Sequence, residues 1–172
     1  MAELKPETGL VFRYDFVFRE EHARGVDSGK DRPCAIVVAM DQGEGAGHKI
    51  LAAPITHTPP AREGDGVEIP HKLARHLGLD DERMWVKVND LNRFTWEEGR
   101  IPFGVTPVSR DNPAYGVLPD RFHQQVIDGV REQAREKSLA ITPRDDLMSD
   151  YAAQRQQEPN DRARDHDIAD DD

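Results

Sequence analysis

Four aromatic residues recur at every second position near the start of the chain, and this alternation constrains the fold more than any other feature. They are Phe12, Tyr14, Phe16 and Phe18, within segment 10–18. Successive side chains of a β-strand point to opposite faces, so a period of two indicates a strand with one buried face. The segment therefore predicts an early strand packed against an apolar core.

The apolar runs that follow are short and are separated by residues that favour turns. Further strands are expected at 34–40, 49–56, 67–69, 84–88 and 93–96. Two segments have the spacing of amphipathic helices instead, a short one at 70–77 and a closing one at 118–137. This order favours a mostly β, α+β domain, a small twisted barrel with helices on its outside.

A long charged segment separates the first two expected strands. Residues 19–31 contain Gly25 and Gly29 and show no periodicity. They predict an exposed loop, and loops of about 12 residues are more often functional than decorative.

The C-terminal residues differ in composition from the rest of the chain. Residues 144–172 carry ten acidic and four basic side chains, a net charge of −6, so residues 1–143 hold −4 of the total −10. Hardly any large apolar residues occur in this segment, and such a composition favours disorder. We expect one domain over 1–143 and an acidic, disordered tail over 144–172.

Composition also narrows the compartment and the partners. The chain has one cysteine, Cys34, which excludes an intramolecular disulfide and fits a reducing compartment. No apolar run approaches the roughly 20 residues that span a bilayer, and the first residues lack a signal pattern. We expect a cytoplasmic protein that contacts no membrane. Its negative charge argues against a protein that coats nucleic acid non-specifically, and no DNA partner is expected, but it leaves room for a small basic groove.

A series of short motifs resembles one known family. Gly9 precedes the first strand, the pair Arg32 and Pro33 leads from the long loop into an apolar strand, and the next strand ends in Ile55 and Thr56. The later strands and the closing helix follow in a similar order. Over about three quarters of its length the chain resembles the PemK/MazF family of type II toxins.

The resemblance implies an SH3-like barrel that forms a homodimer, cleaves single-stranded RNA without a metal or other cofactor, and is neutralised by an antitoxin protein. On the same basis Arg32 and Thr56 act on the scissile phosphate. A guanidinium suits that role because it forks two donors toward phosphate oxygens. His57 is a third catalytic candidate, since histidine transfers protons near neutral pH. Strand alternation turns His57 away from Thr56 unless the strand ends there.

Four further residues are candidates for RNA contact. They are Lys30 at the end of the long loop, Thr58 on the side of Thr56, Arg93, and Trp96, whose ring offers a stacking face for a base. Packing inside the barrel is the other interpretation of Trp96. The histidines of the short helix are five residues apart, which does not place two ligands on one helical face, so no metal site is expected.

A second hypothesis remains open beside the toxin ribonuclease. Arg32 also fits an ordinary exposed loop residue, and Thr56 fits a strand residue with a satisfied hydroxyl. Segment 89–93 departs from the family, which has a further polar or basic residue there that Arg93 replaces only by a shifted register. The alternative is a catalytically inactive barrel of the same type that binds RNA or a protein partner.

Overall fold

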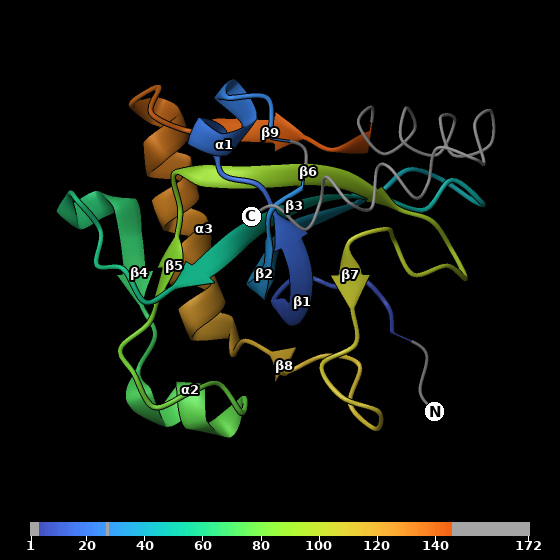
Figure 1. The fold of residues 1–172 in the computed structure, drawn as a ribbon, viewed down its shortest axis with the longest axis horizontal. Coiled ribbons are helices and arrows are strands. Elements are labelled where there is room, and N and C mark those ends of the chain that lie inside the picture. The colour runs from blue at the N-terminus through green and yellow to red at the C-terminus, as the bar shows by residue number, and fades with distance from the viewer. Residues whose placement is uncertain (1–3, 27, 146–172) are drawn as a thin grey trace, which may run out of the picture.

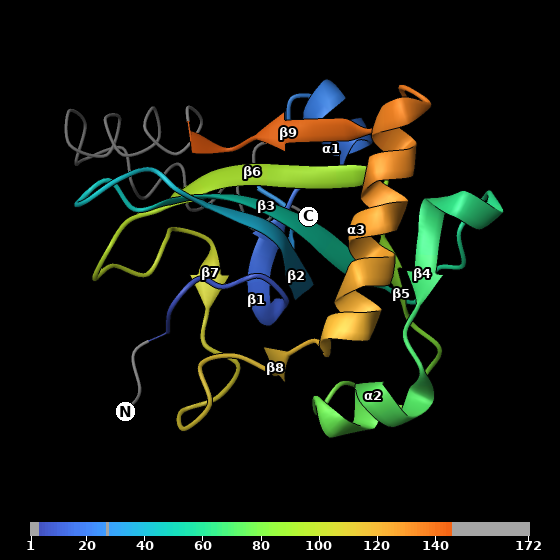
Figure 2. The same ribbon diagram turned by 180° about the vertical axis from the view of Figure 1, so that it is seen from behind.

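A computed structural model describes residues 4–26 and 28–145, and strands dominate this part of the chain (Figures 1 and 2). The strands are β1 Leu10–Phe16, β2 Lys30–Asp41, β3 His48–Thr56, β4 Gly66–Glu68, β5 Trp85–Lys87, β6 Asp90–Trp96, β7 Val105–Thr106, β8 Gly116–Val117 and β9 Ala140–Pro143. The helices are α1 Arg19–Ala23, α2 His71–His76 and α3 Asp120–Arg135, with a 3₁₀ turn η1 at Glu63–Asp65. The expected mostly β, α+β class is confirmed.

The strands form one open sheet in the order β4-β5-β3-β2-β1-β7, with β8 also pairing with β1. β6 pairs with β3 in antiparallel and with β9 in parallel, and the other ladders of the described residues are antiparallel. Along the side of β3 that faces away from β2, it pairs with β6 as far as Ala52 and with β5 from Ile55 onward. Pro54 lies between the two ladders, where its missing N–H breaks no hydrogen bond. In the described residues no ladder closes the sheet.

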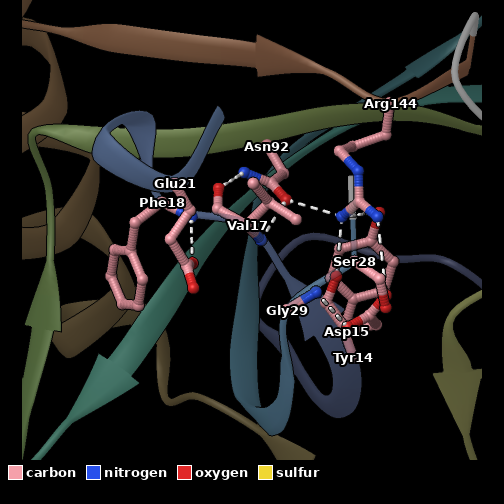
Figure 3. A network of polar contacts seen from close by, with 9 residues as sticks. All are labelled: Tyr14, Asp15, Val17, Phe18, Glu21, Ser28, Gly29, Asn92 and Arg144. Atoms are coloured by element: carbon pink, nitrogen blue, oxygen red, sulfur yellow. Dashed lines mark hydrogen bonds and ion pairs between the residues drawn. The ribbon is translucent and has the colours of Figure 1, made fainter. Parts of the chain in front are cut away.

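Side chains join β1 to β6 where a ladder is missing (Figure 3). The carboxamide of Asn92 accepts the Val17 N–H at 3.0 Å and donates to the Val17 carbonyl at 2.7 Å. Arg144, which is 1% exposed, donates from Nη1 to the Asp15 carbonyl at 2.6 Å and to Asn92 Oδ1 at 3.0 Å. Arg144 and Asp145 therefore belong to the folded part, although the sequence assigned them to the tail. The rest of the predicted tail, 146–172, lies outside the described residues.

The two faces of β1 and β2 contribute to two apolar clusters. Phe12, Tyr14 and Phe16 are fully buried on one face, and the Tyr14 ring stacks on Phe94 with centroids 4.7 Å apart. Val11 is buried on the opposite face, in the cluster that also includes residues of α3. The predicted aromatic face is therefore present and buried, whereas on the opposite face Val11 is buried and Arg13 and Asp15 are only partly buried. Burying one such large apolar side chain contributes about 1.5–3 kcal/mol.

Both predicted helices are present and cover the same cluster. α3 presents Phe122, Val126 and Val130 to it, and α2 adds Ala74. Figures 1 and 2 show α3 beside β4 and β5, with α2 below them.

The segment predicted as an exposed loop, 19–31, is partly regular. It contains α1, and β2 already begins at Lys30 because β1 pairs with it up to that residue. Two side chains hold the connection: Glu21 Oε1 accepts the Phe18 N–H at 2.9 Å and Asp15 Oδ1 accepts the Gly29 N–H at 2.7 Å (Figure 3). These two side-chain bonds could not be predicted from the sequence, because hydrophobic periodicity gives no information on single polar contacts.

Candidate functional site

A groove of about 580 Å³ lies where the start of β2 meets the end of β3. Five of the residues proposed from the sequence line it, namely Lys30, Arg32, Thr56, His57 and Thr58. The hairpin explains this convergence. Cys34 lies opposite Pro54 in the antiparallel register, so the residues two positions further out, Arg32 and Thr56, come together. We call this feature the Arg32 groove.

An aromatic ring holds the guanidinium of Arg32. Its Cζ lies 4.7 Å from the centroid of the Phe18 ring, and Lys87 Nζ lies 5.0 Å from the same centroid. Such cation–π contacts contribute about 0.5–1 kcal/mol at exposed sites. Arg32 makes no ion pair among the described residues, and its Nε has no hydrogen-bond partner there. The guanidinium therefore lies at the groove, held against the Phe18 ring.

Thr56 and His57 line the same groove because β3 ends at Thr56. Beyond the last strand residue the alternation of faces no longer applies, so His57 does not have to turn away. The Thr58 N–H donates to Thr56 Oγ1 at 3.1 Å. This bond uses a lone pair of the hydroxyl and leaves its hydrogen to be donated to a ligand.

His57 has a carboxylate partner that the sequence analysis missed. Its Nε2 lies 2.6 Å from Asp80 Oδ2 and 3.7 Å from Glu82 Oε2. Asp80 also lines the Arg32 groove. The partner stands 23 residues further along the chain, and no spacing rule joins a strand end to a turn at that distance. The acidic run at 80–82, shortly after α2, was the signal that the sequence offered.

The ligand atoms of His57, Asp80 and Glu82 all lie within 4.8 Å of one another, and the three residues are exposed. A ring nitrogen with two carboxylates is a donor set that divalent cations use. The expectation of no metal site stays a prediction, which a chelator tests directly.

A second hollow of about 630 Å³ adjoins the Arg32 groove and shares Thr56 and Thr58 with it. Phe18, Lys87 and Asp90 contribute to its lining. Burial raises the pKa of the Asp90 carboxyl, although the Arg19 N–H, at 3.0 and 3.2 Å from its two oxygens, opposes this.

Two predicted RNA contacts are not brought to either hollow. Trp96 is 2% exposed and packs edge-on against Phe12, with centroids 6.0 Å apart. Its ring therefore serves the core, which was the alternative interpretation. Arg93 is exposed on β6, between Leu51 of β3 and Pro143 of β9. It lies in the open sheet and lines neither hollow.

Two other residues with reactive side chains, Tyr115 and Cys34, lie at the Arg32 groove or next to it in the chain. Tyr115 lines the Arg32 groove and is half-buried, and burial raises the pKa of its hydroxyl. Cys34 is fully buried in the aromatic cluster, where burial strongly raises the pKa of its thiol. A thiol without access to solvent and without thiolate character is not a nucleophile.

No model of a known protein family matches this chain, and no curated protein matches it. In the part of the chain that the structure describes, none of the helices combines the length and the apolar character needed to span a bilayer.

Proposed function

We propose that the protein is an endoribonuclease that cleaves single-stranded RNA without a metal, by attack of a ribose 2′-hydroxyl on the adjacent phosphate. The observation that carries this proposal is the convergence of Arg32, Thr56 and His57 on one groove. With the resemblance of the sequence to PemK/MazF toxins, the proposal extends to an SH3-like barrel acting as a cytoplasmic homodimer, neutralised by an antitoxin in a type II toxin–antitoxin system.

The proposed step divides the chemistry among the groove residues. The 2′-oxygen bonds to phosphorus and the bond to the 5′-oxygen breaks, which yields a 2′,3′-cyclic phosphate and a 5′-hydroxyl. His57 accepts the proton of the 2′-hydroxyl, and water protonates the departing 5′-oxygen. Arg32 and the Thr56 hydroxyl donate hydrogen bonds to the phosphate oxygens, whose negative charge grows in the transition state.

The surroundings of the Arg32 groove support binding of a chain longer than one nucleotide. Lys30 lies at the groove and Lys87 lies at the adjoining hollow, so both can neutralise phosphates. Asp31, a potential source of repulsion, is paired with Arg13 at 3.2 Å.

A cleavage assay in a chelator tests the proposal. The full chain is incubated with a long single-stranded RNA in EDTA, alongside Arg32→Ala and the exposed loop variant Arg110→Ala. We expect wild type and Arg110→Ala to cut equally. Arg32→Ala should be about 100- to 1,000-fold slower, the usual loss when a donor to transition-state charge is removed. RNA left intact by the wild-type protein contradicts the ribonuclease.

One observation favours the second candidate, a non-catalytic module of the same type. Within segment 89–93, where the family has a further polar or basic residue, Asn92 is fully buried and bonded to Val17. Asp90 is 1% exposed and holds the Arg19 backbone. Both side chains stabilise the fold, and neither of them lines the Arg32 groove. In fluorescence anisotropy such a module binds a labelled RNA in EDTA without shortening it, and Arg32→Ala weakens that binding.

A further inference from the structure

We infer that Asp80 is a positioning residue for His57, holding the imidazole in the tautomer whose Nδ1 accepts the proton of the RNA 2′-hydroxyl. This inference rests on the proposed function of the Arg32 groove and deepens it. A catalytic base is usually oriented by a third group, and the structure places a carboxylate where such a group belongs.

The hydrogen bond determines which ring nitrogen carries the proton. His57 Nε2 and Asp80 Oδ2 are 2.6 Å apart. An ionised carboxylate has no hydrogen to give, so Nε2 must donate. A neutral imidazole has a single N–H, and Nδ1 therefore has a lone pair that can take a proton.

Asp80 is itself held in place. Its Oδ1 accepts the Glu82 N–H at 3.0 Å, while Oδ2 contacts His57. The preceding residue, Leu79, is 8% exposed and anchors this turn in the apolar cluster behind the groove. The carboxylate is thus fixed by a turn on one side and by the imidazole on the other. Such a constraint lowers the entropy cost of orienting the base.

The charges around His57 suit a residue that becomes cationic during the step. Asp80 and Glu82 lie on the Nε2 side, with Glu82 Oε2 at 3.7 Å. The other charged or titratable groups of the groove are Lys30, Asp31, Arg32 and Tyr115. Two carboxylates close to the ring stabilise the imidazolium that forms when Nδ1 takes the proton, which is the role of the carboxylate in a catalytic triad. The cations Lys30 and Arg32 serve the phosphate.

The test compares Asp80→Asn with Asp81→Asn in the full chain. Asp81 is the exposed neighbour of Asp80 and lines neither hollow, and its substitution removes the same charge. For Asp80→Asn we expect kcat to fall about 10- to 100-fold, less than the roughly 100- to 10,000-fold that acid–base catalysis contributes as a whole, because His57 itself remains. KM should change less than about twofold. The pH–rate profile of Asp80→Asn should differ from that of wild type, because the neutral amide removes a charge beside the ring. Asp81→Asn should match wild type in rate and profile.

A second readout does not depend on cleavage. The ¹⁵N chemical shifts of the His57 ring above pH 8 report which nitrogen is protonated. We expect the Nε2–H form in wild type and a mixture of tautomers in Asp80→Asn. If wild type shows Nε2–H but cuts no RNA, the proposed function fails while the positioning contact stands.

Other outcomes overturn the inference even if RNA is cleaved. These are an Nδ1–H tautomer in wild type, an unchanged kcat and profile in Asp80→Asn, or an equal loss in Asp81→Asn. Loss of wild-type cleavage in EDTA with recovery in Mn²⁺ also overturns it, because Asp80 then acts on a cation.

Discussion

The side-chain amide of Asn92 replaces a strand neighbour for Val17. It accepts the Val17 N–H at 3.0 Å and donates to the Val17 carbonyl at 2.7 Å, so one residue of β6 supplies both bonds of a β-bridge (Figure 3). The same Oδ1 accepts Nη1 of Arg144. A single side chain therefore connects the segment after β1 with β6 and with the end of β9, across the place where the sheet stays open.

Replacing Asn92 by alanine should destabilise the protein by about 2–4 kcal/mol, because the buried Val17 N–H and carbonyl lose their partners and Arg144 loses an acceptor. Urea unfolding measures the change. Asn112→Ala, in an exposed loop, is the control and should stay within about 0.5 kcal/mol of wild type. A loss below 1 kcal/mol in Asn92→Ala would show that the bridge is not a structural bond.

Asp145→Asn should cost stability at neutral pH and not in acid. Burial raises the pKa of Asp145, but hydrogen bonds from Thr95 and the Lys49 ammonium outweigh it and lower the pKa below the ordinary value. The ionised form thus stabilises the fold above the unfolded pKa of about 4, and this contribution is lost as the pH falls through the folded pKa. The carboxylate is 38% exposed, so screening limits the effect to about 1 kcal/mol at pH 7.

Thermal unfolding of Asp145→Asn at several pH values between 7 and 2.5 checks this dependence. The difference from wild type should shrink toward zero at the acid end. A difference that stays constant with pH would assign the effect to packing.

His123 should make the fold sensitive to mild acid. It is 9% exposed on α3, and burial lowers the pKa of its ring. As the pH falls through about 6.5, the unfolded chain binds a proton at this histidine more readily than the folded chain does. The free energy of unfolding is therefore highest above that pH and decreases below it. Unfolding at pH 7 and pH 5 should show a smaller acid loss in His123→Gln than in wild type. The exposed control His22→Gln should lose as much as wild type.

Gly29→Ala should weaken both the fold and RNA binding. A Cβ on Gly29 would lie 1.9 Å from the Phe16 carbonyl oxygen. The backbone at Gly29, which directly precedes the first residue of β2, would therefore have to shift. Overpacking of this kind costs about 1–3 kcal/mol. Gly64→Ala is the matched control, since its nearest neighbour would be the Gln133 amide at 3.8 Å. Urea unfolding and anisotropy with a labelled RNA measure the two effects, and equal behaviour of both variants would contradict the prediction.

Phe18→Leu should slow RNA cleavage without removing it, because the Arg32 guanidinium loses the ring that holds it at 4.7 Å. A cation–π contact of about 0.5–1 kcal/mol corresponds to a two- to fivefold change in rate. Phe18→Tyr keeps the ring and should keep the rate. Steady-state kinetics on one RNA substrate measure both rates. Equal rates for the two variants would show that the Phe18 ring does not support the action of Arg32.

Local patterns in the amino-acid sequence were enough to predict most of the secondary structure elements and to name candidate site residues. Periodicity identifies β1, α2 and α3, because burial of alternate or third-and-fourth residues leaves a local pattern, and short apolar runs between turn residues identify β2 and β3. Arg32 and Thr56 were proposed from the family resemblance, and the structure brings them together because β2 and β3 are antiparallel neighbours.

The tertiary structure alone decided the remaining contacts. Asp80 reaches His57 across 23 residues, Asn92 reaches Val17 across 75, and Arg144 reaches Asp15 across 129. Each is a polar bond between elements that no spacing connects, and a buried polar group needs its partner wherever the chain supplies one. The fold also placed Trp96 in the core, because a ring on the inner face of β6 gains more from burial among Phe12 and Phe94 than from exposure to solvent.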